Sequence, residues 1–168
     1  MSSNSKKVLI VDDDEVARRL LRRLLQRDYC LAEATTGEQA LEIFPVFLPD
    51  LLTLDIMMPG IEGPKVCRLL RSNRFGQRVP VIIVSAEATR EDKARAYEAG
   101  ADDYIVKPFD PDELRSRIKQ HLEIPIVPSK KKLERMALPP VSLEFREMRW
   151  TEFSGQQTGL NDTDFILK

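Results

Sequence analysis

Five polar side chains stand directly after apolar segments of the chain, at positions where they could do chemistry together. Residues 7–11, 51–54, 81–84 and 103–106 are mainly apolar and are read as short strands. The polar residues that follow or end these segments are Asp12, Asp13, Asp55, Ser85 and Lys107. In a parallel sheet the carboxyl ends of the strands meet at one edge, where ligand chemistry collects. The spacing therefore predicts a single site built from these five side chains.

The types of these side chains indicate phosphoryl chemistry beside a divalent cation. Carboxylates packed together repel one another and raise each other's pKa values, and a hard cation such as Mg²⁺ relieves that repulsion with oxygen ligands. Lys107 is a flexible charge that can contact a carboxylate or a phosphoryl oxygen. Ser85 can donate a hydrogen bond to an added phosphoryl group. The set predicts covalent acceptance of a phosphoryl group at Asp55.

Each of these residues also has a simpler interpretation when it is taken alone. Asp55 could cap a turn, because aspartate is a common turn residue. Asp12 and Asp13 could mark the start of a helix, Ser85 could cap the next turn, and Lys107 could be a solvated surface lysine. The coincidence of all five at matched strand ends favours one site over five unrelated features.

The elements that must position these residues alternate along the chain. A fifth strand is predicted over residues 30–34, and helices are predicted to begin near Glu15, Thr36, Pro64, Arg90 and Asp110. The second helix is expected to stop before Pro45, because proline disrupts a helix interior. Strands that alternate with helices through short connections predict an α/β fold, a doubly wound parallel sheet with helices on both faces.

Several finer expectations concern which side chains are buried. The first helix carries apolar residues at helical spacing, and the helix over residues 90–99 has only a weak apolar face of Ala94, Tyr97 and other alanines. Cys30 and Cys67 match no metal-ligand spacing and are predicted to be buried free thiols. His121 is predicted to be a surface residue of the last helix. The apolar set of the first helix is Val16, Leu20, Leu21, Leu24 and Leu25.

Composition sets limits without choosing a partner. The 168 residues carry 26 lysines and arginines against 27 aspartates and glutamates, so net charge argues for neither a nucleic-acid nor a membrane partner. Apolar runs are only a few residues long, and the polar residues 1–7 lack the apolar centre of a signal peptide. We therefore expect a cytoplasmic protein with no membrane segment.

At the level of motifs, residues 6–124 resemble the receiver domain of two-component response regulators. The matching motifs are Val-Leu-Ile-Val-Asp-Asp-Asp, Leu-Asp-Ile-Met-Met-Pro-Gly, Val-Ser-Ala and Asp-Tyr-Ile-Val-Lys-Pro-Phe. The resemblance implies a flavodoxin-like sheet with strand order 2-1-3-4-5. It implies a phosphoryl group transferred to Asp55 from a sensor histidine kinase. It also implies a signalling switch that is not an enzyme beyond its own phosphoryl transfer and dephosphorylation.

The resemblance assigns further roles around the acceptor. It implies that Mg²⁺ is bound by Asp13, Asp55 and the backbone carbonyl of Met57, with Asp12 acting through water. It implies that Ser85 and Lys107 contact the phosphoryl oxygens, that Ser85 moves toward them, and that Tyr104 is the aromatic switch residue. The bond between Lys107 and Pro108 matches one that is usually cis in the family.

Charges on the face formed by residues 90–122 match the winged-helix, OmpR/PhoB-like class of response regulators. Lys93 with Glu113, and Asp103 with Arg117, occupy positions that pair across a symmetric dimer in that class. The simpler interpretation is solvated helix charges, whose pairs are individually weak. Arg115 departs from the small residue expected in the apolar part of that interface. Because four charged positions match, we still expect a homodimer formed on phosphorylation, with a downstream protein partner as the alternative output.

The last part of the chain is harder to interpret. We assign residues 1–124 to the receiver, 125–140 to a linker, and 141–168 to an extension with strand-like segments that loosely resembles the start of a winged-helix domain. Trp150 is expected to be a packing residue there. From Pro125 onward, seven lysines and arginines face six aspartates and glutamates. With so little attraction for phosphates and no room for a recognition helix, we expect this chain to bind no DNA sequence specifically.

Two other functions remain as alternatives. One is a Mg²⁺-dependent phosphatase with an aspartyl-phosphate intermediate, but residues 12–16 lack the threonine that enzymes of the haloacid dehalogenase type carry after the first strand. The other is a binding scaffold that works without phosphorylation, against which the complete acceptor set argues.

Overall fold

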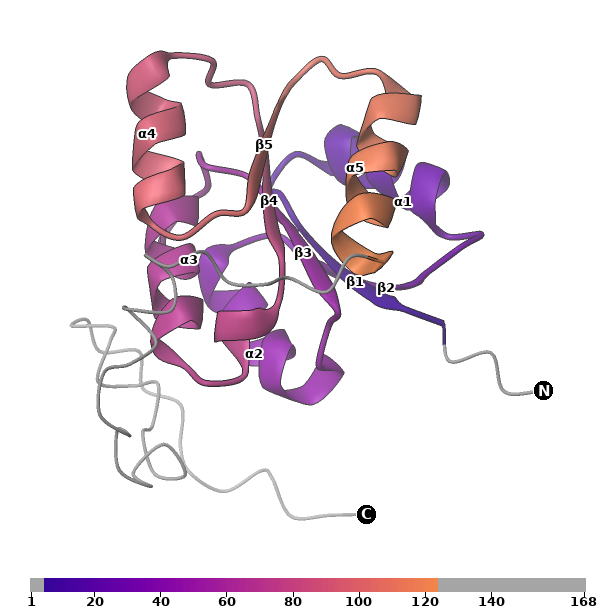
Figure 1. The fold of residues 1–168 in the computed structure, drawn as a ribbon, viewed down its shortest axis with the longest axis horizontal. Helices are drawn as coiled ribbons and strands as arrows, with labels where there is room; N and C mark the ends of the chain where they lie inside the picture. The colour runs from indigo at the N-terminus through magenta and orange to yellow at the C-terminus, as the bar shows by residue number, and fades with distance from the viewer. Residues whose placement is uncertain (1–4, 124–168) are drawn as a thin grey trace. The chain divides into compact units, whose positions relative to one another are not determined.

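Five parallel strands form one sheet in the computed structural model, which describes residues 5–123. Their order across the sheet is β2-β1-β3-β4-β5, which confirms the expected flavodoxin-like topology (Figure 1). All four neighbouring pairs are parallel. The strands are β1 Lys7–Val11, β2 Cys30–Ala34, β3 Leu51–Leu54, β4 Val81–Ser85 and β5 Asp103–Val106.

A helix follows each strand and packs back on the sheet. Helices α1 and α5 cover one face, and α2, α3 and α4 cover the other (Figure 1). No helix within residues 5–123 is long and apolar enough to cross a membrane. The predicted linker and extension, with Trp150, lie outside the described residues. The helices are α1 Glu15–Leu25, α2 Gly37–Phe47, α3 Gly63–Ser72, α4 Arg90–Glu98 and α5 Pro111–Glu123, with a short 3₁₀ helix η1 at Gly76–Arg78.

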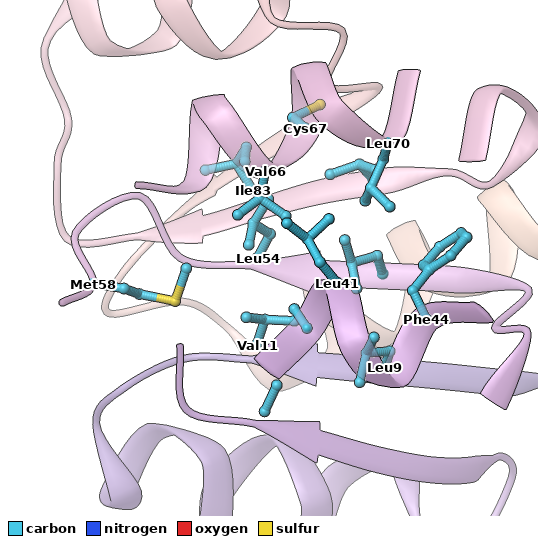
Figure 2. Packing of buried hydrophobic residues seen from close by; sticks show 14 of the residues in the cluster. Leu9, Val11, Leu41, Phe44, Leu54, Met58, Val66, Cys67, Leu70 and Ile83 are labelled. Carbon is cyan, nitrogen blue, oxygen red and sulfur yellow. The ribbon is translucent and has the colours of Figure 1, made fainter. Parts of the chain in front are cut away.

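The alternation of side chains along each strand creates two apolar cores. On β1, Leu9 and Val11 join the core under α2, α3 and α4, whereas Val8 and Ile10 join the core under α1 and α5. Figure 2 shows the first core, in which Phe44 of α2 and Leu70 of α3 lie over the strands. Because both faces of the sheet are covered, the strands are almost continuously apolar.

Helix starts and stops follow the local signals of the sequence. Asp14 caps α1 and accepts a hydrogen bond from the Val16 amide. Asp110 caps α5 and accepts from the amides of Asp112 and Glu113 at 2.7 and 3.1 Å. Beyond α4, Gly100 adopts a φ of 103°, a left-handed conformation that suits glycine.

The predicted stop of α2 before Pro45 is wrong, because the helix continues through this residue to Phe47. Pro45 lies in the last turns, where its ring costs one backbone hydrogen bond and its fixed φ remains compatible with a helix. The helix ends instead where Leu48 adopts a left-handed φ of 51° and its amide donates to the carbonyl of Phe44 at 2.9 Å.

The apolar face of α1 is narrower than predicted. Leu21 and Leu25 are buried, but Val16 is 75% exposed and Leu20 is 44% exposed. Residues four apart share a helix face, so Leu21 and Leu25 occupy the line that faces the sheet, and Val16 and Leu20 fall on a neighbouring line.

Two other burial predictions need correction. On α4 the buried residue is Ala96, whereas Ala94 and Tyr97 are exposed, so this helix packs through even less apolar surface than expected. Both cysteines are free, as predicted, but only Cys67 is buried. Cys30 is exposed because it opens β2, which lies at the edge of the sheet.

We expect Leu21→Ala to lower the free energy of unfolding by about 2–5 kcal/mol, because it removes a fully buried side chain. The same change at the adjacent exposed position, Leu20→Ala, should cost less than about 1 kcal/mol. Urea denaturation of both variants tests this pair. Equal losses would show that the assigned face of α1 is wrong.

Candidate functional site

The ends of β1 and β3 place two of the predicted carboxylates side by side. Val11 pairs with Leu54 in the sheet, and the Asp55 amide donates to the Val11 carbonyl at 2.9 Å. Asp12, directly after β1, donates its amide to the Ala34 carbonyl at 3.1 Å. The register of neighbouring parallel strands therefore brings Asp12 and Asp55 to the same edge.

Three carboxylates gather there. Asp12, Asp13 and Asp55 each offer a carboxylate oxygen within 4.8 Å of the other two. Asp12 is only 1% exposed and Asp55 is 8% exposed, whereas Asp13 faces solvent. The prediction that these side chains form one cluster is thus met by the geometry.

Lys107 completes the cluster from the end of β5, which is an edge strand of the sheet. Its amide donates to the Ser85 carbonyl at 2.8 Å, which holds it at the end of β5. Its ammonium donates to Asp12 Oδ2 at 2.5 Å and to Asp55 Oδ2 at 2.9 Å. One positive charge is therefore shared by two nearly buried carboxylates that are far apart in the sequence.

The environment shifts two of these groups in the same direction. Burial raises the pKa of Asp12, because it disfavours the charged form, and the neighbouring Lys107 only partly opposes the rise. Burial acts to lower the pKa of Lys107, but its hydrogen bonds to Asp12 and Asp55 outweigh this and raise the pKa. The ammonium is therefore held in its charged form between the carboxylates.

Backbone amides fix the remaining oxygens of the two buried carboxylates. The Ile56 amide donates to Asp55 Oδ1 at 2.6 Å, and the Asp14 amide donates to Asp12 Oδ1 at 2.9 Å. Within residues 5–123, the Asp13 carboxylate accepts no hydrogen bond. Asp13 is therefore the carboxylate of the cluster that remains open to a ligand.

The donor set fits Mg²⁺. It consists of carboxylate oxygens with a solvent-facing member, and Mg²⁺ prefers oxygen ligands and retains several waters. Met57, two residues after Asp55, has an exposed side chain. A thioether does not suit a hard cation, so only the backbone carbonyl of Met57 is chemically suited to the predicted role.

Sequence reasoning missed the importance of Gly63 for this site. Gly63 begins α3 and lies so close to the loop after β3 that an added Cβ would overlap the Asp55 carbonyl oxygen. Its amide donates to the Ile56 carbonyl at 3.0 Å. The pair Gly63-Pro64 at the start of a helix was the available signal, but it did not reveal which backbone required the space.

Ser85 and Tyr104 lie on neighbouring strands beside the cluster. Ser85 is buried, and its hydroxyl accepts from the Glu87 amide at 3.4 Å. The Tyr104 hydroxyl donates to the Glu87 carbonyl at 2.7 Å. Burial, reinforced by Asp92 and Glu87, raises the pKa of Tyr104 to about 12, so its hydroxyl remains a donor. Both predicted switch residues therefore contact the same loop after β4.

The peptide bond between Lys107 and Pro108 is cis, as predicted.

The four residues predicted for a dimer face lie on α4, β5 and α5, but three of them already pair within the chain. Arg117 donates to both oxygens of Asp103, at 3.2 and 3.1 Å, and approaches Glu113 at 3.7 Å. The Lys93 ammonium lies 5.8 Å from the centre of the Tyr104 ring. This ring joins the predicted face to the predicted switch.

The prediction that His121 is a surface residue is wrong. His121 is partly buried, and its Nε2 lies 3.1 Å from an oxygen of Asp103. Asp103 is itself buried, and a buried carboxylate needs partners because it has lost its water. The histidine and Arg117 supply them from the same side of α5.

Residues 8–119 match the response regulator receiver domain family. The probable transcriptional regulator ycf27 of Cyanophora paradoxa is 43% identical over 123 residues, which cover 73% of this chain and 50% of that protein. The transcriptional regulatory protein ResD of Bacillus subtilis is 42% identical over 118 residues, covering 70% of this chain and 48% of ResD. The chain thus spans about half the length of the curated relatives that it matches.

Solved structures agree with the fold. A putative response regulator from Chloroflexus aurantiacus superposes with a TM-score of 0.68 at 36% identity, covering 71% of this chain and 98% of that one. The receiver domain of the sensor histidine kinase PA1611 from Pseudomonas aeruginosa, solved with magnesium in its active-site cleft, gives a TM-score of 0.66 at 27% identity, covering 70% and 98%. The chain belongs to the response regulator receiver domain family.

Proposed function

We propose that this chain is a phosphorylation-controlled switch that accepts a phosphoryl group on Asp55 from a phosphohistidine of a sensor histidine kinase. The observation that carries the proposal is the Asp55 carboxylate, held between the Ile56 amide and the Lys107 ammonium and flanked by Asp12 and Asp13. A carboxylate fixed in this way is oriented for attack and already has a cation beside it to balance incoming negative charge.

The transfer is an in-line displacement at phosphorus. One Asp55 oxygen forms a bond to phosphorus while the phosphorus–nitrogen bond of the phosphohistidine breaks, and the departing imidazole nitrogen takes up a proton. Lys107, now bound to Asp12 and Asp55, is close enough to turn toward the new phosphoryl oxygens. Ser85 can donate its hydroxyl proton to another of these oxygens, because its hydroxyl oxygen accepts from the Glu87 amide and its hydroxyl proton can rotate toward the site.

Asp13, Asp55 and the Met57 carbonyl would hold Mg²⁺, with Asp12 as an outer partner. The ion supplies positive charge that stabilises the phosphoryl oxygens in the transition state. Asp13 serves this role because its carboxylate is exposed and accepts no hydrogen bond within residues 5–123. The magnesium in the cleft of the Pseudomonas receiver domain supports the proposal.

The output follows from the loop after β4. Phosphorylation adds negative charge and acceptor oxygens that draw Ser85 away from the Glu87 amide. Tyr104, which holds the Glu87 carbonyl, would then change its position together with this loop. Helix α4 follows the loop and buries only Ala96, so little apolar packing resists its movement. The changed face of α4, β5 and α5 would drive dimerisation or contact a partner.

The relatives named as transcriptional regulators support an output in transcription. The residues predicted for the linker and extension lie outside the described part of the chain. The expectation that this chain binds no specific DNA sequence stays a prediction.

We expect incubation with acetyl phosphate and Mg²⁺ to add one acid-labile phosphoryl group to the chain, detected as an increase in intact mass. Asp55→Asn should abolish the labelling, because the amide lacks the nucleophilic oxygen. Asp112→Asn, at an exposed position on α5, is the matched control and should label normally. Full labelling of the Asp55 variant would overturn the assignment.

We expect Asp13→Asn to weaken Mg²⁺ binding by more than about tenfold, since even outer partners of a metal site change its affinity by that much. In metal-free buffer the same variant should have a higher free energy of unfolding, by up to about 1 kcal/mol, because one of three repelling charges is removed. The adjacent change Asp14→Asn should alter neither quantity, since asparagine also caps helices well. Calorimetric titration and urea denaturation measure the two effects, and similar results for both variants would contradict the proposed geometry.

We expect the chain activated with beryllofluoride to form a two-fold dimer through Lys93, Glu113, Asp103 and Arg117. Glu113→Lys should weaken the dimer, and so should high salt, because charges supply the contacts. Glu42→Lys, the same charge reversal at an exposed position on α2, is the control. Sedimentation that finds only activated monomer at high protein concentration would exclude this face as a dimer contact.

A further inference from the structure

Arg18 of α1 reaches back over the loop that carries Asp12 and Asp13. Its Nη1 donates to the carbonyls of both residues, at 2.8 Å to Asp12 and 2.9 Å to Asp13. Neither strand nor helix uses these carbonyls, because β1 ends at Val11 and the first helical bond runs from the Arg18 amide to Asp14. Arg18 therefore satisfies two acceptors that the regular structure leaves over.

These two carbonyls determine the direction of the Asp13 side chain. The Asp12 carbonyl belongs to the rigid peptide plane before the Asp13 Cα, and the Asp13 carbonyl belongs to the plane after it. Holding both planes fixes φ and ψ of Asp13, and with them the direction of its Cα–Cβ bond. Since the Asp13 carboxylate accepts no hydrogen bond within residues 5–123, this backbone constraint is what aims it toward Asp55.

The guanidinium is itself held in place. Its Nε lies 3.7 Å from Glu33 Oε2 on β2, and the Arg18 side chain is mostly buried. Glu33 also faces Arg22 one turn later, at 3.3 Å. A guanidinium anchored at β2 can keep the loop after β1 in one conformation, because this planar group has few ways to rearrange.

We propose that Arg18 is a positioning residue for the Mg²⁺ site, which sets the direction of Asp13 before the ion arrives. The inference rests on the proposed function, since it assigns a role toward the same metal. A positioning role and a purely electrostatic role predict opposite changes in Mg²⁺ affinity when Arg18 is removed. Removing a positive charge near a cation site strengthens cation binding by Coulomb's law, whereas removing a positioning group weakens it.

The test is calorimetric titration of the full chain with MgCl₂ at fixed pH and ionic strength. Arg18→Ala should raise the Mg²⁺ dissociation constant about tenfold, although it removes a positive charge. Arg18→Lys keeps the charge but is too short to bond both carbonyls fully, so its loss should be smaller. Arg19→Ala, which removes the same charge from an exposed neighbour paired with Glu15, is the matched control and should bind Mg²⁺ as well as the unmodified chain or better.

A second readout needs no metal. The Asp14 amide donates to Asp12 Oδ1 across the loop that Arg18 holds, so its hydrogen exchange in metal-free buffer should be faster in both Arg18 variants and unchanged in Arg19→Ala. Thermal melts confirm that each variant is folded, and Arg18→Lys carries the test if Arg18→Ala is not.

The outcomes separate the role of Arg18 from the existence of the Mg²⁺ site. Unchanged or tighter Mg²⁺ binding in Arg18→Ala, or unchanged exchange at Asp14 in both Arg18 variants, would overturn the role of Arg18 and leave the proposed function standing. Failure of the unmodified chain to bind Mg²⁺ would overturn the metal site itself, while the exchange experiment would still show whether Arg18 orders the loop.

Discussion

Like charges held close together are the constraint on which the rest of this molecule depends. Asp12, Asp13 and Asp55 offer oxygens within 4.8 Å of one another, two of them on nearly buried side chains. Such an arrangement is unfavourable unless positive charge is held beside it. Lys107 supplies one charge to Asp12 and Asp55 and leaves Asp13 without a hydrogen-bond donor among residues 5–123. The site is therefore only partly neutralised, and the remaining negative charge is what would attract the proposed divalent cation.

Apolar packing away from the site offsets the cost of this repulsion. Both cores lie below the edge that carries the carboxylates, and apart from Lys7 the strands that position Asp12 and Asp55 are buried on both faces. Short connections then fix the loops, as when Gly63 allows α3 to begin directly against the Asp55 backbone. A site that costs stability can thus be kept because the free energy of folding comes from elsewhere in the domain.

The sequence predicted this arrangement to the extent that the backbone determines it. Residues that end parallel strands reach one edge by topology, so Asp12, Asp55, Ser85 and Lys107 could be grouped from their positions alone. Long side chains that cross between elements leave no such pattern. The sequence places His121 at the surface although it faces Asp103, and no sequence pattern marks Arg18 although it donates to two carbonyls of the acidic loop. The predicted stop before Pro45 is wrong because proline disrupts the interior of a helix but is tolerated in its last turns.

Coupling between the site and the dimer face needs an element with two arrangements, and the contacts around Tyr104 suit one. In the unphosphorylated chain its hydroxyl holds the Glu87 carbonyl, and its ring lies beside the Lys93 ammonium. A change at Ser85 that releases Glu87 would also free the ring, and movement of the ring would alter the surroundings of Lys93. On the same face Asp103 already has Arg117 and His121 as partners, so a dimer contact to Asp103 must exchange an existing ion pair for a new one. Such an exchange would contribute little net free energy, whereas Lys93 has no carboxylate partner within residues 5–123 and would gain one in the proposed dimer. In the proposed dimer, Lys93 would therefore contribute more than Asp103, and Lys93 is the residue whose surroundings Tyr104 would change.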